Sequence, residues 1–232
     1  MRQEDQQDVR TLPLFAGMDA VNFADLMRVA YLQTFPPQVQ LITEGETADF
    51  LHVVVEGMVE LFAQANGRET TMAVVRPVST FILAAVLKDA PYLMSARTLE
   101  KSRILLIPAE DIRAVMERDA DFDRAIILEL ASCYRAVVKA QKDLKLRSGA
   151  ERLANYLLRQ HEVQGSSGRL TLETDKRTLA GRLGMTPENL SRAFGTLRPY
   201  GVVVNGAEIE LSNLKDLEIL AKPDPLIDDP AI

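Results

Sequence analysis

The chain is poor in the residues that build redox and metal centres. Its 232 residues include one cysteine, Cys133, and two histidines, His52 and His161. An internal disulfide needs two thiols and a cysteine-held iron–sulfur cluster needs about four, so one chain can supply neither. A tetrahedral zinc site also draws mainly on cysteine and histidine. The composition therefore argues against an iron–sulfur cluster and predicts no metal site.

Long apolar runs are also missing. No run approaches the ~18 residues that a membrane-spanning helix needs, and the start, MRQEDQQDVR, has no apolar core of a signal peptide. With 47 % apolar and 26 % charged residues, the sequence is typical of a soluble globular protein. These features predict a cytoplasmic protein without a membrane partner, and the length favours two domains.

Charge is distributed unevenly along the chain. Residues 1–119 carry 11 Lys and Arg against 17 Asp and Glu, a net −6, whereas residues 120–215 carry 15 against 11, a net +4. Residues 216–232 carry 1 against 5, a net −4. Because regional charge decides whether a surface can approach phosphates, the basic middle region keeps nucleic acid among the candidate partners.

The hydrophobic pattern predicts an α+β protein whose strands come first. Asp19 is a candidate N-cap for a short amphipathic helix, after which β-branched strands and glycine-containing turns alternate. Many short strands predict an antiparallel β-roll over residues 1–119. Residues 120–148 contain no proline or glycine and predict one long helix. Residues 149–232 form the third predicted domain.

Apolar residues recur along the predicted long helix at spacings of 4, 3, 4, 3 and 4. They are Ile126, Leu130, Cys133, Val137, Ala140 and Leu144. Such a narrow seam is typical of a helix that pairs with another helix, and it predicts a homodimer. Packing of this face on its own domain is the alternative. On the dimer interpretation, Cys133 is a small apolar core residue.

The stretch from 174 to 206 predicts a winged helix-turn-helix. Thr174 can cap a first helix that Gly184 ends, and Thr186 with Pro187 can start a second helix. A hairpin that turns at Asn205-Gly206 would form the wing.

The second predicted helix has a buried face and an outward face. An apolar stripe leaves Glu188, Ser191 and Arg192 together on the outside. In a major groove, arginine pairs with guanine, glutamate accepts from cytosine, and serine contacts base or phosphate, so these three are the candidate base-reading residues. The alternative is a plain helical hairpin with a Glu188–Arg192 surface pair. The candidate phosphate contacts are Thr186, Lys176, Arg177, Arg182 and Arg198.

The order of β-roll, long helix and winged helix-turn-helix resembles the CRP/FNR superfamily of bacterial transcription regulators. The stretches that carry the resemblance are LFAGM, LITEGETADFLHVVVEGMVELF, SARTLEKSRILLIP and PENLSR. PENLSR is similar to the FNR-like branch, which reads TTGAT half-sites, whereas CRP-like members carry arginine at the position of Pro187. The resemblance implies a homodimer that binds double-stranded DNA, responds to a small effector in the roll and contacts RNA polymerase.

The effector pocket implied by the resemblance contains Phe81, Leu83, Ala84, Met94, Ser95 and Arg97. Members that bind cyclic nucleotides carry Gly-Glu and Arg-Ser pairs, where this chain has Leu83-Ala84 and Met94-Ser95. Since a buried phosphate needs a paired donor, the sequence argues against cyclic AMP. TFILAAVLKDAPYLMSA is similar to the nitric-oxide-responsive, haem-dependent regulators of denitrification. That similarity implies haem as a candidate cofactor and His52 as its candidate ligand, with a structural histidine as the alternative.

Two other functions are alternatives to that of a DNA-binding regulator. One is a small-molecule or haem-binding module that acts through protein contacts without DNA. The other is an enzyme, for which the sequence offers no nucleophile with a base and no phosphate-cradling glycine loop. The sequence leaves open whether the acidic, proline-rich tail KPDPLIDDPAI is ordered, although it favours a frayed terminus.

Overall fold

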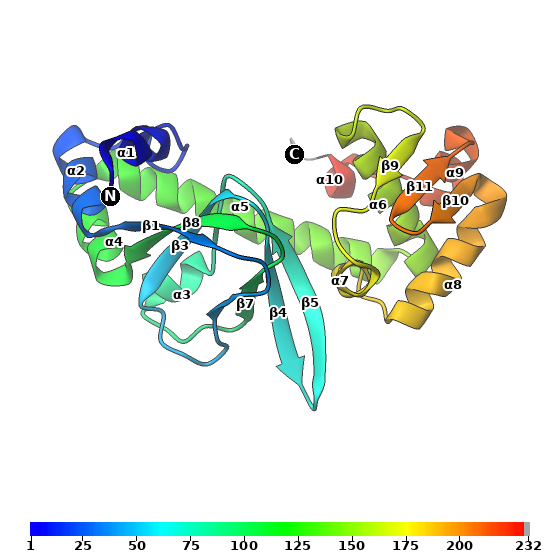
Figure 1. Cartoon of the computed structure of the whole chain (residues 1–232), viewed down its shortest axis with the longest axis horizontal. Helices are drawn as coiled ribbons and strands as arrows, with labels where there is room; N and C mark the ends of the chain where they lie inside the picture. Colours follow the sequence, from blue (N-terminus) through cyan, green and yellow to red (C-terminus); the bar gives the residue numbers. More distant parts are fainter. Residues whose placement is uncertain (230–232) are drawn as a thin grey trace. The chain divides into compact units, whose positions relative to one another are not determined.

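The computed structural model describes residues 1–229. The chain divides into two compact units, Met1–Tyr134 and Arg135–Ile232, and the boundary lies inside one long helix, α5 (Ala120–Leu146) (Figure 1). Each unit has a hydrophobic core of its own. In the described part of the chain, no helix is both long and apolar enough to cross a membrane.

The first unit is an antiparallel β-roll, which confirms the predicted α+β class. Its strands are β1 (Tyr31–Phe35), β2 (Gln40–Ile42), β3 (Phe50–Glu56), β4 (Val59–Ala65), β5 (Arg68–Val75), β6 (Ser79–Phe81), β7 (Ser95–Thr98) and β8 (Ser102–Pro108). They form two four-stranded sheets with the orders β1-β8-β3-β6 and β2-β7-β4-β5. The helices are α1 (Gln3–Arg10), α2 (Ala20–Val29), α3 (Leu83–Lys88) and α4 (Ala109–Met116).

Two aspartates organise the helices of the first unit. Asp19 caps α2 as predicted, because its carboxylate accepts from the N–H groups of Val21 and Asn22 at 2.8 and 3.2 Å. Asp119 accepts from the N–H groups of Asp19 and Phe122, both at 2.9 Å, and so ties the start of α2 to the start of α5. The entry of α5 is therefore held by hydrogen bonds as well as by packing.

The first turns of α5 belong to the core of the β-roll unit. Ile126 is fully buried there, and Leu130 packs against the same cluster. The assignment of Ile126 to a dimer seam is therefore wrong, because the packing of its own unit already covers this side chain. Farther along the helix, the side chain of Val137 is 59 % exposed and that of Leu144 is 42 % exposed.

The second unit contains the C-terminal half of α5 and a helical domain with a small sheet. Its elements are α6 (Gly149–Val163), β9 (Arg169–Thr171), α7 (Lys176–Arg182), α8 (Pro187–Leu197), the 3₁₀ turn η1 (Arg198–Tyr200), β10 (Val202–Asn205), β11 (Glu208–Leu211), α9 (Leu214–Ala221) and α10 (Pro225–Asp228). The strands form an antiparallel sheet with the order β10-β11-β9. The described part of the tail, residues 222–229, contains α10 and is therefore ordered, so of the two alternatives left open by the sequence the favoured one, a frayed terminus, does not hold there.

Candidate nucleic-acid interface

Helices α7 and α8 form the predicted helix-turn-helix. The cap of α7 is Asp175, whose carboxylate accepts from the N–H of Thr178 at 2.7 Å. The prediction of Thr174 as the cap was wrong by one residue, because both side chains are good caps and only the path of the backbone selects between them. At the other end, Gly184 has φ +63° and closes α7 as predicted.

Gly184 is favoured by its positive φ, and its turn lies close to a side chain of α5. A Cβ atom at this position would lie 2.3 Å from Cδ2 of Leu144, on the C-terminal part of α5. The turn therefore packs directly on α5, within the second unit. Leu144, which the sequence assigned to a dimer seam, is in contact with the turn of its own chain. A larger residue at 184 would require the Leu144 side chain to move aside.

Helix α8 begins and packs as the sequence predicts. Thr186 caps it by accepting from the N–H of Asn189 at 3.3 Å, and Pro187 occupies its first position. Leu190, Phe194 and Leu197 are buried against the rest of the unit, which confirms the apolar stripe. Glu188, Ser191 and Arg192 are exposed on the opposite side of the helix.

Hydrogen bonds orient two of these three side chains. The pKa of the Glu188 carboxyl lies below its usual value, chiefly because the Thr186 side chain hydrogen-bonds to it and, to a lesser degree, because of the Arg192 charge. Glu188 is thus an ionised acceptor. Arg192 donates from Nη2 to Oδ1 of Asn189, a residue that sequence reasoning did not single out. The i, i+3 spacing of Asn189 and Arg192 was the available signal.

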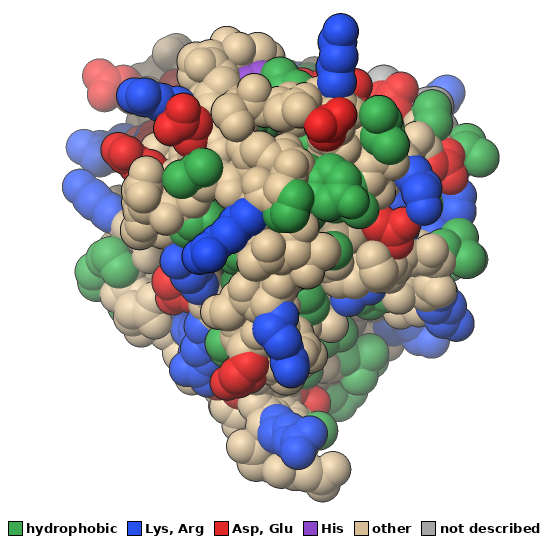
Figure 2. Space-filling view, turned by 90° about the vertical axis from the view of Figure 1, so that its right-hand side faces the viewer, with side chains coloured by type: hydrophobic (Ala, Val, Ile, Leu, Met, Phe, Trp, Pro, Cys, Tyr) green, Lys and Arg blue, Asp and Glu red, His purple; other side chains and the backbone are tan. Residues whose placement is uncertain are grey.

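The candidate phosphate contacts do not lie at one place. Lys176 and Arg198 line a cavity of about 540 Å³ together with Ser191 and residues 202–204 of β10. The Arg182 guanidinium instead lies 5.3 Å from the ring centroid of the buried Tyr156. Arg177 is exposed on α7, and Thr186 serves as the cap of α8. Figure 2 views this side of the molecule, where lysine and arginine side chains are interspersed with acidic and hydrophobic ones.

The wing turns one residue later than expected. Asn205 pairs with Glu208, so the turn consists of Gly206 and Ala207, with φ +68° at Gly206. The predicted turn at Asn205-Gly206 was therefore shifted, since Asn205 still belongs to β10. The hairpin pairs through β11 with β9, which precedes α7 along the chain.

The residues assigned to an effector pocket are mostly engaged in the β-roll unit. Phe81 and Leu83 are buried in its core, whereas Ala84 is exposed and Met94 is half-buried. Oγ of Ser95 accepts from the N–H of Glu44 at 3.0 Å.

Arg97 is held by two carboxylates and one ring. Its Nε lies 2.7 Å from Oε2 of Glu60, and its Nη2 lies 2.9 Å from Oε1 of Glu69. Its guanidinium also lies 4.3 Å from the centroid of the Phe62 ring. The side chain of Glu60 is only 2 % exposed, so Arg97 compensates a buried charge. Arg97 is thus already neutralised within the unit.

His52 is packed inside the β-roll unit. Its side chain is 4 % exposed, its ring lies 5.1 Å from that of Phe81, and its Nδ1 lies 3.1 Å from the carbonyl oxygen of Phe50. Burial lowers the pKa of His52 to about 4, against the opposing effect of the carbonyl. A haem iron could reach this buried ring only if the packing around His52 opened. The surroundings fit a structural histidine better than a haem ligand.

Comparison with known proteins assigns both units. Residues 32–119 match the family model of the cyclic nucleotide-binding domain, and residues 151–220 match that of the Crp-like helix-turn-helix domain. The chain is 28 % identical over 213 residues to the cyclic AMP receptor protein of Thermus thermophilus, covering 90 % of this chain and 96 % of that protein.

Two further proteins are similar to this chain over most of its length. The CRP-like cAMP-activated global transcriptional regulator of Mycobacterium tuberculosis is 21 % identical over 210 residues, covering 88 % of this chain and 94 % of that protein. The solved structure of FixK2 from Bradyrhizobium japonicum is similar with a TM-score of 0.70 at 23 % identity, covering 84 % of this chain and 99 % of that one. The likeness to FixK2 bears on the fold.

Proposed function

This chain belongs to the CRP/FNR superfamily of DNA-binding transcription regulators, and from that premise we propose that it is a homodimer that reads an inverted repeat of TTGAT-like half-sites under the control of a small effector. The observation that carries the proposal is the outward face of α8. Glu188, Ser191 and Arg192 are exposed there together, while the opposite face of the same helix is buried.

The chemistry of this face suits the edges of base pairs. The Arg192 guanidinium has five N–H donors, one of which bonds to Asn189, and its fork matches the two acceptors of guanine. The ionised Glu188 can accept from the cytosine amino group, and the Ser191 hydroxyl can donate or accept. Lys176 and Arg198, beside the cavity next to α8, are the best placed of the candidate phosphate contacts.

Exposed apolar side chains on α5 support a homodimer. The large ones are Ile127, Leu128, Tyr134, Val137, Val138, Leu144 and Leu146. Water-exposed apolar residues in such number along one helix mark an interaction site, and a second copy of the same helix is the simplest partner for a palindromic site. The proposed seam starts at Leu130 and Cys133 rather than at Ile126, and it includes Tyr134 and Val138.

The effector is proposed to bind in the β-roll unit and to be apolar. Arg97 is paired with Glu60 and Glu69 and gives a cyclic phosphate no free cation. The expected effector of this chain therefore differs from cyclic AMP, for which the relatives from Thermus thermophilus and Mycobacterium tuberculosis are named. Gating requires only that the effector bind one arrangement of the dimer more tightly than the other.

Selection from random duplex DNA tests the reading face. The wild type is expected to enrich a TTGAT-like inverted repeat. Arg192→Ala should weaken binding to that repeat about 5- to 150-fold, as expected for the loss of one bidentate base contact. Lys215→Ala, which removes an exposed cation on α9, should leave binding within about twofold. A module that acts without DNA predicts that no repeat is enriched and that Arg192→Ala retains function.

Sedimentation equilibrium tests the dimer separately. Val137→Glu places a charge among the exposed apolar residues of α5 and should shift the protein towards monomer. Lys145→Glu introduces the same residue at an exposed polar position of the same helix and should leave the dimer intact. Equal association of both variants would exclude this part of α5 from the interface.

A further inference from the structure

The joint between α5 and α6 is short and carries a buried charge. Helix α5 ends at Leu146 and α6 begins at Gly149, so two residues connect them. Ser148 caps α6 in a reciprocal pair with Glu151, which leaves Arg147 as the other joint residue. The Arg147 side chain is only 6 % exposed. The backbone dihedral angles of two connecting residues do not by themselves fix the angle between the helices. Contacts with other parts of the chain must therefore hold that angle.

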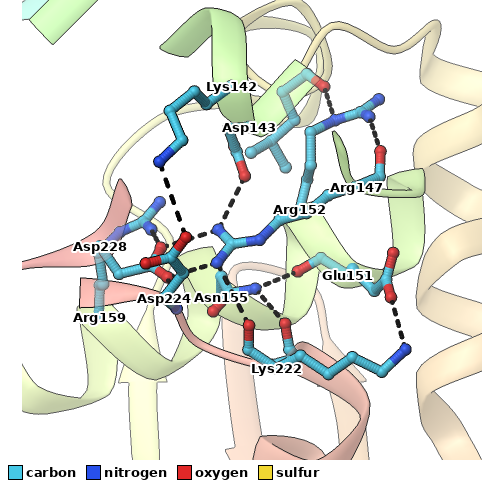
Figure 3. Close-up of polar contacts among 12 residues, drawn as sticks. Lys142, Asp143, Arg147, Glu151, Arg152, Asn155, Arg159, Lys222, Asp224 and Asp228 are labelled. Carbon is cyan, nitrogen blue, oxygen red and sulfur yellow. Dashed lines mark hydrogen bonds and ion pairs between the residues drawn. The ribbon is translucent and has the colours of Figure 1, made fainter. Parts of the chain in front are cut away.

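The C-terminal segment closes over this joint. Asp228 of α10 accepts from Nη1 and Nη2 of Arg147 at 2.9 and 2.5 Å, a bidentate pair, and also from Nη1 of Arg159 at 2.5 Å (Figure 3). Nη1 of Arg147 additionally lies 2.9 Å from Oδ1 of Asp143 on α5. Asp228 thus binds the joint residue and α6 at once.

Further contacts attach the same segment to α5. Nζ of Lys139 donates to the carbonyl oxygen of Asp229 at 2.7 Å, and Nζ of Lys142 lies 3.7 Å from Oδ2 of Asp224. The N–H of Asp224 donates to Oδ2 of Asp228 at 2.8 Å, which closes α10 on itself. Residues 224–229 therefore bridge the C-terminal part of α5 and helix α6.

The joint is also connected to the helix-turn-helix. Nη1 of Arg152 donates to the carbonyl oxygen of Arg147 at 2.6 Å, and Nε of Arg152 donates to the carbonyl oxygen of Leu183 at 2.8 Å. The turn at Leu183 and Gly184 precedes α8. A continuous set of hydrogen bonds therefore runs from Asp228, through Arg147 and Arg152, to the turn that positions the reading helix.

We propose that residues 224–229 form a strap that sets the angle between α5 and α6, and thereby the spacing between the two reading helices of the dimer, with Arg147 and Asp228 as positioning residues. This inference rests on the proposed function of a dimeric regulator that binds an inverted repeat. None of the strap residues needs to touch DNA. Loosening the strap leaves each reading face intact while it widens the range of half-site spacings that the dimer accepts.

The test compares operators that differ only in the distance between their half-sites. Insertion or removal of one base pair moves a half-site by about 3.4 Å and rotates it by about 34°. The wild type should bind its preferred spacing about tenfold more tightly than spacings one base pair longer or shorter, a difference typical of a fixed dimer geometry. Asp228→Asn should reduce this preference to about threefold, with single half-site affinity unchanged within about twofold.

Glu218→Gln is the matched control, because it removes one carboxylate charge from an exposed position of α9. It should retain the wild-type spacing preference. An unchanged preference in Asp228→Asn would overturn the strap. So would an equal loss of affinity at every spacing and at the single half-site, since Asp228 would then only stabilise the fold.

Two further comparisons distinguish a failure of the strap from unfolding of the variant and from a failure of the proposed function. If circular dichroism shows that Asp228→Asn is unfolded, Asp224→Asn decides by the same comparison. Its amide oxygen can still accept from the N–H of Leu226 and cap α10, whereas the charge that faces Lys142 is lost. A wild type that binds no inverted repeat overturns the proposed function itself. A wild type that binds one spacing selectively, beside variants that bind it equally selectively, overturns only the strap.

Discussion

His52 should make the stability of the β-roll unit depend on pH. The ring is buried against Phe81, and burial lowers its pKa from 6.5 to about 4, while the hydrogen bond to the Phe50 carbonyl opposes that change. In the unfolded chain, the ring regains the ordinary value near 6.5. The folded state therefore excludes a proton that the unfolded state accepts.

The sign and size of the effect follow from this difference. Because the folded-state pKa is the lower one, the contribution to stability is fully present above about pH 6.5 and is lost as the pH falls towards 4. At pH 5, protonation of His52 raises the statistical weight of the unfolded chain about 30-fold and that of the folded chain only about 1.1-fold. The ratio of these two factors corresponds to a loss of about 2 kcal/mol in the free energy of unfolding. The titration of His52 alone accounts for this loss of stability.

The measurement is urea unfolding at about pH 7.5 and pH 5, followed through the NMR amide signals of β3. His52→Gln serves as the reference, since its side chain keeps an N–H donor for the Phe50 carbonyl but does not titrate. The wild type should lose about 2 kcal/mol more than this variant between the two pH values. Equal losses, or an imidazole signal of His52 that titrates near pH 6.5, would refute the reasoning.

Three other predictions concern stability and binding. Gly184→Ala should destabilise the second unit by about 1–2 kcal/mol in thermal unfolding, because φ is positive at this position and the Leu144 side chain must also move to make room for the new Cβ. Gly195→Ala, in α8 with no atom within 4 Å of its new Cβ, should stabilise it by up to about 1 kcal/mol, and equal signs for both variants would contradict the account. Arg97→Ala should cost about 3 kcal/mol in the β-roll unit because Glu60 loses its cation, and a change below about 1 kcal/mol would show that water replaces the guanidinium. Operator affinity, measured by fluorescence anisotropy, should fall about 10³- to 10⁵-fold between about 50 and 200 mM salt if six to ten phosphates are contacted, and a flat salt dependence would argue against DNA.

Much of the fold and of the reading helix was predictable from short stretches of sequence. Asp19 and Thr186 cap their helices, Pro187 follows a cap, and Gly184 ends α7, all as predicted. These features depend on backbone groups within about four residues of the side chain, so a local pattern is sufficient. For the same reason, helical periodicity predicted which face of α8 is buried and which is exposed.

The wrong predictions concern positions whose local sequence is compatible with two different structures. Thr174 and Asp175 are both acceptable caps, and the chain uses Asp175. The wing turn is displaced by one residue because Asn205 can occupy either a strand end or a turn. Ile126 has the spacing of a dimer seam, but its periodicity indicates only that a face is covered, and the covering side chains are those of its own unit.

What the sequence determined by itself is the set of local structures and the chemistry of the reading face: the order of elements, the caps of α2 and α8, and the exposure of Glu188, Ser191 and Arg192. Only the tertiary structure decided which charges meet. Arg97 joins Glu60, 37 residues away, and Arg147 joins Asp228, 81 residues away. Such pairs form because folding brings distant segments together and burial makes an unpaired charge costly, and neither condition leaves a periodic signal in the sequence.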